Sequence, residues 1–325
     1  MDTEISRQLG KLEEKFSALG QDMPSWLEGL LVSNPLPYWD YIHLETLLSL
    51  QNPRTDFPDE VIFIVYHQIT ELYFRLVLHE MEQIANNGKS VDERGADGGW
   101  NEALDAGFFV ERLGRMNRYF DALTKSFDIM VEGMEPQQFL KFRMALLPAS
   151  GFQSFQYRKM EICATDLVNL VDKDFRKAFQ KQGRPSLSEM FEHIYWKQGA
   201  IELKSGEKTL TLKQFEEKYS SALKDIAGEY KHKNIWQKYN GLPAEARSGQ
   251  ELKAALRQFD QNVNVKWPLV HFKSAVRYLK EQGQDTAASG GTNWKEYLPP
   301  RHRLRIFYPS LWNAEEIENW GRLNG

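Results

Sequence analysis

The feature that most constrains the fold of this 325-residue chain is a long apolar segment, DEVIFIVYHQITELYFRLVLHEMEQIA, at residues 59–85. Its apolar side chains recur every three or four positions, at Ile62, Tyr66, Ile69, Tyr73 and Leu76. That spacing predicts one long helix. The apolar set is too wide for a helix with a broad solvated face, so we expect this helix to be buried on most sides. Such a helix needs other helices around it, which favours a mainly α fold.

Helical periodicity continues along the chain and predicts a helical bundle with long central helices. Further helices are expected at about 102–127, 137–147, 152–171, 214–239 and 250–282. Pro268 lies inside the last of these and predicts a kink or a helix start there. Residues 200–213 alternate apolar and polar side chains, which predicts a small β-hairpin. The stretches 88–99 and 283–294 are polar or rich in glycine, and we expect loops there.

The N-terminal segment carries a narrow apolar seam. Its members are Ile5, Leu9, Leu12, Phe16 and Leu19. This spacing is typical of a helix that packs along one line against a partner. The partner surface belongs either to the same domain or to another subunit, and the pattern favours neither. We expect residues 1–325 to form a single helical domain, with residues 1–50 as an N-terminal arm.

Composition excludes several classes of protein. Cys163 is the one cysteine, which excludes an internal disulfide, a multi-cysteine zinc site and covalent haem attachment through Cys-x-x-Cys-His. The net charge of -4 and the pI of about 6.0 do not indicate nucleic-acid binding. The polar N-terminus does not resemble a secretory signal, and no run of about 18 apolar residues indicates a membrane span. These features predict a cytoplasmic protein.

The long central helix carries the first candidate for chemistry. Residues 63, 67, 71 and 75 share one stripe, because they are four apart. His67 on this apolar helix must either be hydrogen-bonded or face a cavity. One reading is a core histidine paired with Glu71, one turn further on. The other is a histidine that faces a ligand.

The short helix near 137–147 carries the second candidate. Phe139 and Arg143 share a face, and apolar residues surround Arg143. A buried guanidinium requires a carboxylate or another anion as partner. The partner is either one of the 45 acidic side chains of the protein or an anionic ligand. Ser150 and the backbone N–H groups of the turn that follows are close enough along the chain to complete an anion pocket.

His271 is the third candidate, one turn after Trp267 in the segment WPLVHFKSAVRYL. A single histidine without cysteine or carboxylate at ligand spacing does not make a zinc site. It can hold a haem, because haem iron needs only one proximal protein ligand. A histidine packed in the core is the alternative.

These segments together resemble the tryptophan 2,3-dioxygenase family, whose members are haem enzymes. The resemblance rests on YWDYIHLETLLSLQ at 38–51, DEVIFIVYHQITELYFRLVLHE at 59–80, FRMALLPASGFQSFQYRKME at 142–161 and WPLVHFKSAVRYL at 267–279. The segments follow one another in the family's order. The resemblance implies a homotetrameric, mainly helical protein that holds haem b without covalent links. It also implies the reaction of L-tryptophan with O2 to give N-formylkynurenine, the first step of the kynurenine pathway.

The resemblance assigns roles to five of the residues above. His271 resembles the axial ligand of the haem iron, and His67 resembles the distal catalytic histidine that accepts a hydrogen bond from the indole N–H. Phe63 resembles the aromatic wall of the substrate pocket. Arg143 resembles the arginine that binds the substrate carboxylate, and Ser150 resembles the serine near a haem propionate.

Further site residues follow from the same resemblance. Tyr38 and Tyr41 resemble tyrosines of an arm that reaches into the site of a neighbouring subunit. Trp267, next to the axial ligand, is expected beside the haem. Ser289 stands where the family has the threonine that contacts the substrate ammonium, and Thr292 lies in the same loop. Phe139, where bacterial members can carry Tyr, is expected at the substrate.

The loop at 283–294 departs from the family pattern. The family has GTGGSSG after the proximal helix, whereas this chain has DTAASGGTNW at 285–294 and keeps only Gly290-Gly291. This departure supports an alternative, a related haem oxygenase acting on another indole or aromatic amino acid in a biosynthetic pathway. A third alternative is a haem-free helical interaction protein that has kept only the fold.

Overall fold

The computed structural model describes residues 3–33, 36–87, 104–182, 185–198, 200–201, 207–280, 295 and 298–322. Within these residues the protein is helical and has no β-strand, which confirms the mainly α prediction. Ser289 and Thr292 lie outside the described residues, as do the predicted loops at 88–99 and 283–294. The chain divides into two compact units, Met1–Asn52 and Pro53–Gly325.

The N-terminal unit consists of short helices. They are α1 (Thr3–Ala18), α2 (Met23–Val32), α3 (Tyr38–Tyr41) and α4 (Leu44–Leu48). Asp22 caps α2 by accepting a hydrogen bond from the Ser25 backbone N–H. Phe16 and Trp26 stack with ring centroids 5.3 Å apart and so join α1 to α2. No residue of α1 is buried, so its apolar seam is largely exposed to solvent.

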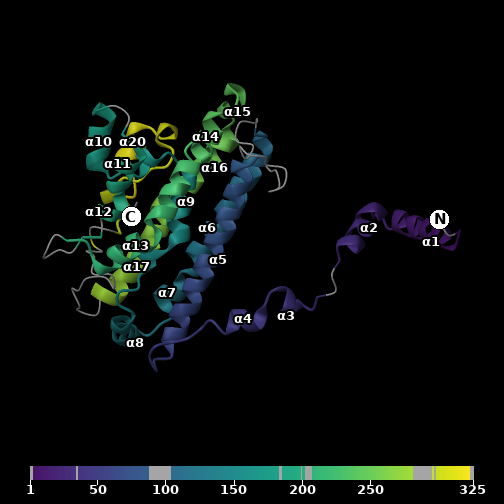
Figure 1. Ribbon diagram of the computed structural model, residues 1–325, viewed down its shortest axis with the longest axis horizontal. Helices are drawn as coiled ribbons and strands as arrows, with labels where there is room; N and C mark the ends of the chain where they lie inside the picture. Colours follow the sequence, from purple (N-terminus) through teal and green to yellow (C-terminus); the bar gives the residue numbers. More distant parts are fainter. Residues whose placement is uncertain are drawn as a thin grey trace. The chain divides into compact units, whose positions relative to one another are not determined.

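The second unit contains the long helices (Figure 1). Its α-helices are α5 (Asp59–Ala85), α6 (Ala106–Ser126), α7 (Asp128–Glu132), α8 (Pro136–Phe142), α9 (Phe155–Ala164), α10 (Lys173–Gln182), α11 (Leu187–Glu192), α12 (Tyr195–Gln198), α13 (Leu210–Glu229), α14 (Ile235–Asn240), α15 (Ala244–Ser248), α16 (Gln250–Gln261), α17 (Trp267–Ala275), α19 (Pro300–Arg303) and α20 (Ala314–Glu318). Single 3-10 turns are η1 (Arg143–Leu146), η2 (Gly151–Gln153), η3 (Leu167–Leu170) and η6 (Pro309–Leu311).

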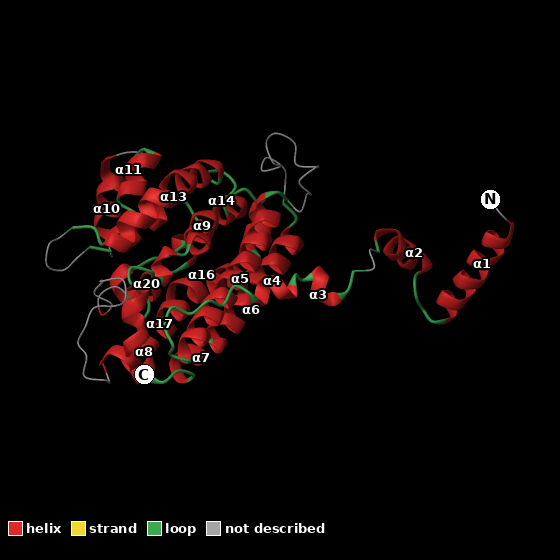
Figure 2. Cartoon of the chain, turned by 60° about the horizontal axis from the view of Figure 1, so that its bottom comes forward, coloured by secondary structure: helices red, strands yellow, loops and turns green. Residues whose placement is uncertain are grey.

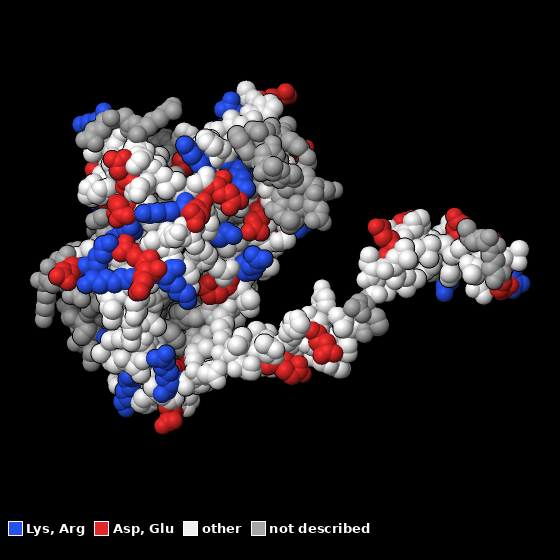
Figure 3. Space-filling model, in the orientation of Figure 1, with Lys and Arg blue, Asp and Glu red and all other residues white. Residues whose placement is uncertain are grey.

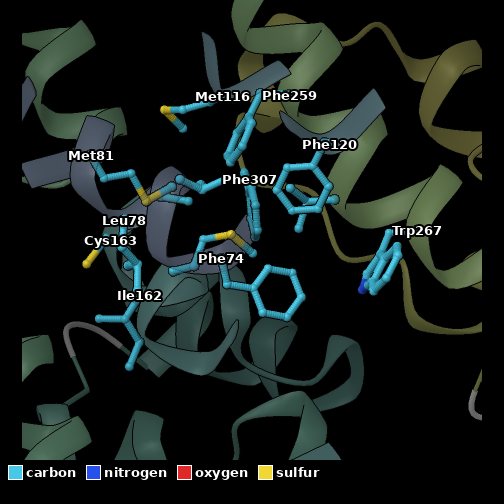
Figure 4. Close-up of a cluster of buried hydrophobic side chains, with 14 of the residues drawn as sticks. Phe74, Leu78, Met81, Met116, Phe120, Ile162, Cys163, Phe259, Trp267 and Phe307 are labelled. Carbon is cyan, nitrogen blue, oxygen red and sulfur yellow. The ribbon is translucent and has the colours of Figure 1, made fainter. Parts of the chain in front are cut away.

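Helix α5 packs into the core of the second unit, but Val61, Leu72 and Leu76 are exposed, so the predicted burial on most sides is confirmed only in part. It packs against α6 and α9, α6 packs against α16, and α9 packs against α13 (Figures 1 and 2). Phe74 of α5, Phe120 of α6 and Phe259 of α16 meet in the cluster that Figure 4 shows, with Trp267 at its edge. Helix α5 also has the length and hydropathy of a membrane-crossing helix, but the same is true of many core helices of globular proteins.

The β-hairpin predicted at 200–213 is confirmed only in part. Its described residues form one antiparallel bridge, between Ile201 and Lys208, and no strand, and residues 202–206 lie outside the described part. From Leu210 on, the chain is helical and the prediction is wrong. Helix α13 begins at Leu210 because the Thr209 side chain accepts a hydrogen bond from the Leu212 backbone N–H and caps the first turn. From Leu210 the capped helix therefore forms in place of the strand that the alternating pattern predicts.

Residues 250–280 form a nearly continuous helical rod with two π-helical turns. These turns are η4 (Asn262–Lys266) and η5 (Val276–Lys280), and they flank α17. Pro268 lies in the first turn of α17, directly after η4, so the backbone hydrogen bond that it cannot donate falls where the rod changes from π-helical to α-helical. Of the predicted kink or helix start at Pro268, the structure shows the start of an α-helical segment, at Trp267.

The surface of the second unit carries charges of both signs side by side. Figure 3 shows lysine and arginine interspersed with aspartate and glutamate on the face in view. One such cluster joins Lys197 and Lys208 to Glu216, with N···O distances of 2.9 and 2.7 Å. On this face, the mixed charges form no large area of a single electrostatic sign, and mixed surface charge favours solubility.

Candidate functional site

A cavity of about 310 Å³ in the second unit brings together most of the predicted site residues. Its size falls within the usual range for small-molecule sites, which starts at roughly 300 Å³. The predicted residues that line it are Phe63, His67, Phe139, Arg143, Ser150, Trp267 and His271. They come from α5, α8, the turns after α8, and α17.

The His67 ring is fixed by its own helix. Its Nδ1 lies 2.7 Å from the Phe63 carbonyl oxygen, and because a carbonyl can only accept, Nδ1 must carry the proton. The Nε2 lone pair is then left for the cavity. The alternative reading, a pairing of His67 with Glu71, does not hold: the Nδ1 proton goes to Phe63, and the Glu71 carboxylate accepts a hydrogen bond from Gln156 at 2.9 Å. Burial lowers the pKa of His67, which keeps the ring neutral.

His271 has the same arrangement on α17. Its Nδ1 lies 2.9 Å from the Trp267 carbonyl oxygen, one turn earlier, which leaves the Nε2 lone pair for a ligand. Burial, reinforced by the nearby His67, lowers the pKa of His271 to about 4. The rings of Phe127 and Trp267 hold the imidazole in place, with centroids 4.4 and 4.3 Å from it. His271 is therefore neutral and rigidly held at pH 7.

The helix that carries His271 is locally unusual. Both of its neighbouring turns, η4 and η5, are π-helical. Such turns are rare, and they occur frequently at functional sites because they shift the direction of the side chains that follow. The local structure is thus consistent with a functional role for α17.

Arg143 lies where α8 passes into η1, one turn after Phe139. The guanidinium is buried at the cavity wall, and burial lowers its pKa. Ser150 begins η2, where its Oγ accepts a hydrogen bond from the Phe152 backbone N–H. The Gln153 side chain completes this capping box and so fixes the turn that bears Ser150.

Gly151 lets this turn approach the distal histidine. A Cβ at Gly151 would lie 4.0 Å from Nε2 of His67, so a larger side chain here would reach into the cavity beside the imidazole. Only hydrogen stands at that position, and the space beside His67 stays open to a ligand.

An aromatic wall continues from His67 along one side of the cavity. The Phe63 ring lies 4.1 Å from His67 and 6.3 Å from Phe139, centroid to centroid. The Phe139 ring in turn lies 4.7 Å from Tyr278, which belongs to η5 and also lines the cavity. Tyr278 was not among the residues predicted from the sequence, although its position seven residues after His271 indicates the same helix face.

Another side of the cavity is rich in arginine. The fully buried Glu161 forms ion pairs with both Arg158 and Arg305, and all three contact the Tyr195 hydroxyl. Arg303 also lines the cavity. Guanidinium groups form charge-assisted hydrogen bonds with carboxylates, so this side suits a carboxylate-bearing ligand.

This arginine-rich side was likewise not predicted from the sequence. Arg158 ends the string PASGFQSFQYR, so that string could have identified it. Arg305 had no comparable signal, because its partners Glu161, Tyr157 and the Val263 carbonyl are distant in sequence. Asp260 on α16 holds the residues just after Arg305. The Asp260 carboxylate accepts hydrogen bonds from the backbone N–H groups of Phe307 and Tyr308 at 3.0 and 3.1 Å, and burial raises its pKa to about 6.

The remaining predicted site residues are not part of this cavity as described. Tyr38 and Tyr41 lie in the N-terminal unit, where 69% and 74% of their surfaces are exposed. Their assignment to a neighbouring subunit's site stays a prediction, as does that of Ser289 and Thr292.

The donor set of the cavity fits a haem. Haem iron needs only one axial protein ligand, and His271 can supply it. The neutral Nε2 of His271 suits the axial position, and the arginine-rich side suits propionates.

Comparison with known proteins agrees with this geometry. The family model described as tryptophan 2,3-dioxygenase matches residues 29–240, more than half of the chain. The tryptophan 2,3-dioxygenase of Ruegeria sp. (strain TM1040) is 36% identical over 132 residues, 40% of this chain and 41% of the relative. That of Shewanella woodyi is 32% identical over 174 residues, 51% of this chain and 56% of the relative.

A longer alignment has lower identity. The tryptophan 2,3-dioxygenase of Bacillus thuringiensis subsp. konkukian is 26% identical over 288 residues, which cover 86% of this chain and 91% of the relative. In the alignments of higher identity, the chain spans about half the length of the relatives it matches. The match of the family model over more than half of the chain shows that this protein belongs to the tryptophan 2,3-dioxygenase family.

Proposed function

We propose that this protein is a haem-dependent dioxygenase that opens the indole ring of L-tryptophan with O2 to give N-formylkynurenine, the first step of the kynurenine pathway. The observation that carries the proposal is one cavity lined by two neutral imidazoles, His67 and His271, and by the buried Arg143. The relatives' shared name, tryptophan 2,3-dioxygenase, supports the choice of substrate and reaction.

The proposed cofactor is haem b, held without covalent links. His271 would hold the iron through Nε2, with Trp267 packed beside it and Ser150 close to a propionate. Arg158 and Arg305 would stabilise the propionates by their positive charge. When bound, the haem supplies an iron centre at which dioxygen can react with an organic substrate.

The proposed roles at the substrate follow from chemistry and placement. Burying an indole of roughly 200 Å² contributes on the order of 5 kcal/mol, which any indole can obtain from walls such as Phe63 and Phe139. A charge-assisted bond from Arg143 to the substrate carboxylate adds roughly 1.5–3 kcal/mol. Because of Arg143, the protein should therefore bind the amino acid about ten- to a hundredfold more tightly than a bare indole. His67 would orient the ring by accepting the indole N–H at Nε2.

Other contacts are proposed from outside this cavity. Ser289 and Thr292 would offer hydroxyl groups to the substrate ammonium. Tyr38 and Tyr41 would come from the N-terminal arm, residues 1–50, of a neighbouring subunit.

We propose a homotetramer as the working assembly. Two sets of exposed apolar side chains support association with further copies. One set, on α2, comprises Trp26, Leu30, Leu31 and Val32, and the other, on α5, comprises Val61, Leu72 and Leu76. Exposed apolar patches of this kind mark interaction surfaces. A cytoplasmic location and a lack of nucleic-acid or membrane partners are proposed with it.

Product analysis tests the proposed function. The reduced, haem-loaded protein is incubated with L-tryptophan and O2, and the product is identified by mass. A product that has gained two oxygen atoms supports the proposal. A gain of a single oxygen, or turnover of another indole only, favours a related haem oxygenase of a biosynthetic pathway. A protein that stays colourless after expression with a haem precursor favours the interaction protein.

A further inference from the structure

Tyr278 is a cavity residue that none of the roles above uses. It lies in η5, seven residues after His271, and seven residues are about two helical turns, so both side chains face the same way. Both line the cavity. The side chain is 1% exposed, so protein atoms surround it on nearly every side.

Hydrogen bonds fix the Tyr278 ring at its far end. The hydroxyl donates to the carbonyl oxygens of Val131 at 3.1 Å and Met134 at 3.3 Å, at the end of α7 and just beyond it. A buried hydroxyl that lost these acceptors would pay the cost of an unsatisfied polar group. The ring therefore cannot swing away to make room for a larger ligand.

The face of the fixed ring supports the substrate side of the cavity. It packs on Phe139 with centroids 4.7 Å apart and planes inclined by 42°. Phe139 lies one turn before Arg143, and its ring also contacts Phe63 beside His67. Tyr278 thus backs the wall against which the substrate ring would lie.

From this arrangement we infer that Tyr278 is a specificity-determining residue, which limits the size of the aromatic ring that the cavity accepts and so favours unsubstituted indole. The inference rests on the proposed function. Its physical basis is dense packing, because an anchored phenol ring behind Phe139 leaves no room for the wall to yield. A single added methyl group on a substrate is typically discriminated by about ten- to two-hundredfold in such a pocket.

The test compares variants at Tyr278 with a matched control. Tyr278→Val removes the ring, and Tyr278→Phe keeps the ring but removes the hydroxyl. Tyr239 serves as the control site, because it is also buried, also donates to a backbone carbonyl, that of Arg247 at 3.1 Å, and does not line the cavity. Dissociation constants are measured by haem absorption for L-tryptophan and its 5-methyl and 6-methyl derivatives, together with kcat/KM.

The wild-type protein should bind L-tryptophan more tightly than either methyl derivative. The measure of selectivity is the ratio of the dissociation constant for a methyl derivative to that for L-tryptophan. We expect Tyr278→Val to lower this ratio for at least one methyl derivative by about tenfold or more. Tyr278→Phe, which keeps the ring but removes the hydroxyl that anchors it, should change the ratio in the same direction by less than Tyr278→Val does. Tyr239→Val should leave the ratio within about twofold. If Tyr278→Val does not fold, as judged by circular dichroism, Tyr278→Leu repeats the measurement with a smaller loss of volume.

A folded, haem-loaded Tyr278→Val or Tyr278→Leu variant that keeps the wild-type ratio of dissociation constants would overturn this inference. It would leave the proposed function untouched. An equal change of the ratio in Tyr239→Val would also overturn it, because the effect would then be a general loosening of the fold. A wild-type protein that binds no tryptophan would overturn the proposed function and this inference with it.

Discussion

His67 and His271 resemble each other in local geometry and differ in what surrounds them. Each binds the carbonyl oxygen four residues earlier through Nδ1 and turns Nε2 to the same cavity. His67 lies on an uninterrupted α-helix, next to Phe63 and the open space at Gly151. His271 lies between two π-helical turns, enclosed by the rings of Phe127 and Trp267.

The two imidazoles have the same ring chemistry, so their surroundings must decide which one holds the iron and which one contacts the substrate. A rigid, enclosed imidazole suits a permanent ligand of iron, because the coordinating atom stays in place. An imidazole beside open space suits a transient partner that accepts a proton or hydrogen bond from substrate. The two ends of the cavity are accordingly expected to respond differently to substitution.

The largest expected effect is at His271. His271→Ala removes the only axial donor we assign, so the purified variant should lose its haem, seen as loss of the Soret absorption band. The matched variant His67→Ala should retain haem at the wild-type level, because His67 is assigned to substrate. A His271→Ala protein with an unchanged Soret band would show that the two histidines have been assigned wrongly.

Arg143→Ala should give the next largest effect. It should weaken substrate binding and leave haem binding unchanged. Loss of the charge-assisted bond to the carboxylate should raise the KM for L-tryptophan by about ten- to a hundredfold. Haem content, measured on the same preparation, should stay normal. Loss of haem in this variant would instead indicate that Arg143 supports the fold around the cofactor.

His67→Ala should weaken turnover without abolishing it. If His67 only orients the indole through one hydrogen bond, worth roughly 1 kcal/mol, kcat/KM should fall by about five- to tenfold. Steady-state kinetics on haem-loaded protein provide the measurement. Complete inactivity with normal substrate binding would mean that His67 acts as an obligatory base.

The smallest effect expected is that of mild acid on haem binding. Burial lowers the pKa of His271 from its ordinary 6.5 to about 4, so the proton does not compete with iron for Nε2 until the pH approaches 4. The Soret band should therefore persist at pH 5 and be lost only near pH 4 or below. Release of haem around pH 6.5 would indicate an exposed imidazole as ligand.

The lowered pKa of His271 also affects the stability of the haem-free protein in acid. Between pH 6.5 and about 4 the unfolded chain binds a proton at His271 that the folded chain does not, so unfolding becomes easier as the pH falls through this range. Asp260, whose pKa is raised to about 6, acts in the opposite direction between pH 3.8 and 6. His271→Gln should therefore flatten the decline in melting temperature measured from pH 6.5 to 4.

Periodicity predicted the helices well where the packing is regular. Helix α5 follows from apolar spacing, and the start of α17 at Trp267, one residue before Pro268, follows from proline chemistry. The predicted hairpin does not extend past Thr209, because capping by Thr209 is a local hydrogen bond that an alternating pattern does not reveal. Arg305 was not predictable either, because its place depends on contacts with Glu161, Tyr157 and the Val263 carbonyl, which are distant in sequence.

The candidate site was predicted through short strings whose residues the fold then brings together. His67, Arg143 and His271 are far apart in the sequence and line one cavity. What the strings did not reveal is which nitrogen of each histidine is available, since that depends on a backbone carbonyl one turn away. The spacing from His271 could have indicated Tyr278, but the acceptors that fix its hydroxyl, in α7 and just beyond it, are distant in sequence.

The central claim is that one cavity holds both the haem at His271 and L-tryptophan at His67 and Arg143. Titration of the reduced, haem-loaded protein with L-tryptophan, followed by absorption spectroscopy, tests it most directly. We predict a saturable change in the Soret region that D-tryptophan and bare indole produce only at much higher concentration. A colourless protein, or a haem spectrum that L-tryptophan leaves unchanged at every concentration, would contradict the claim.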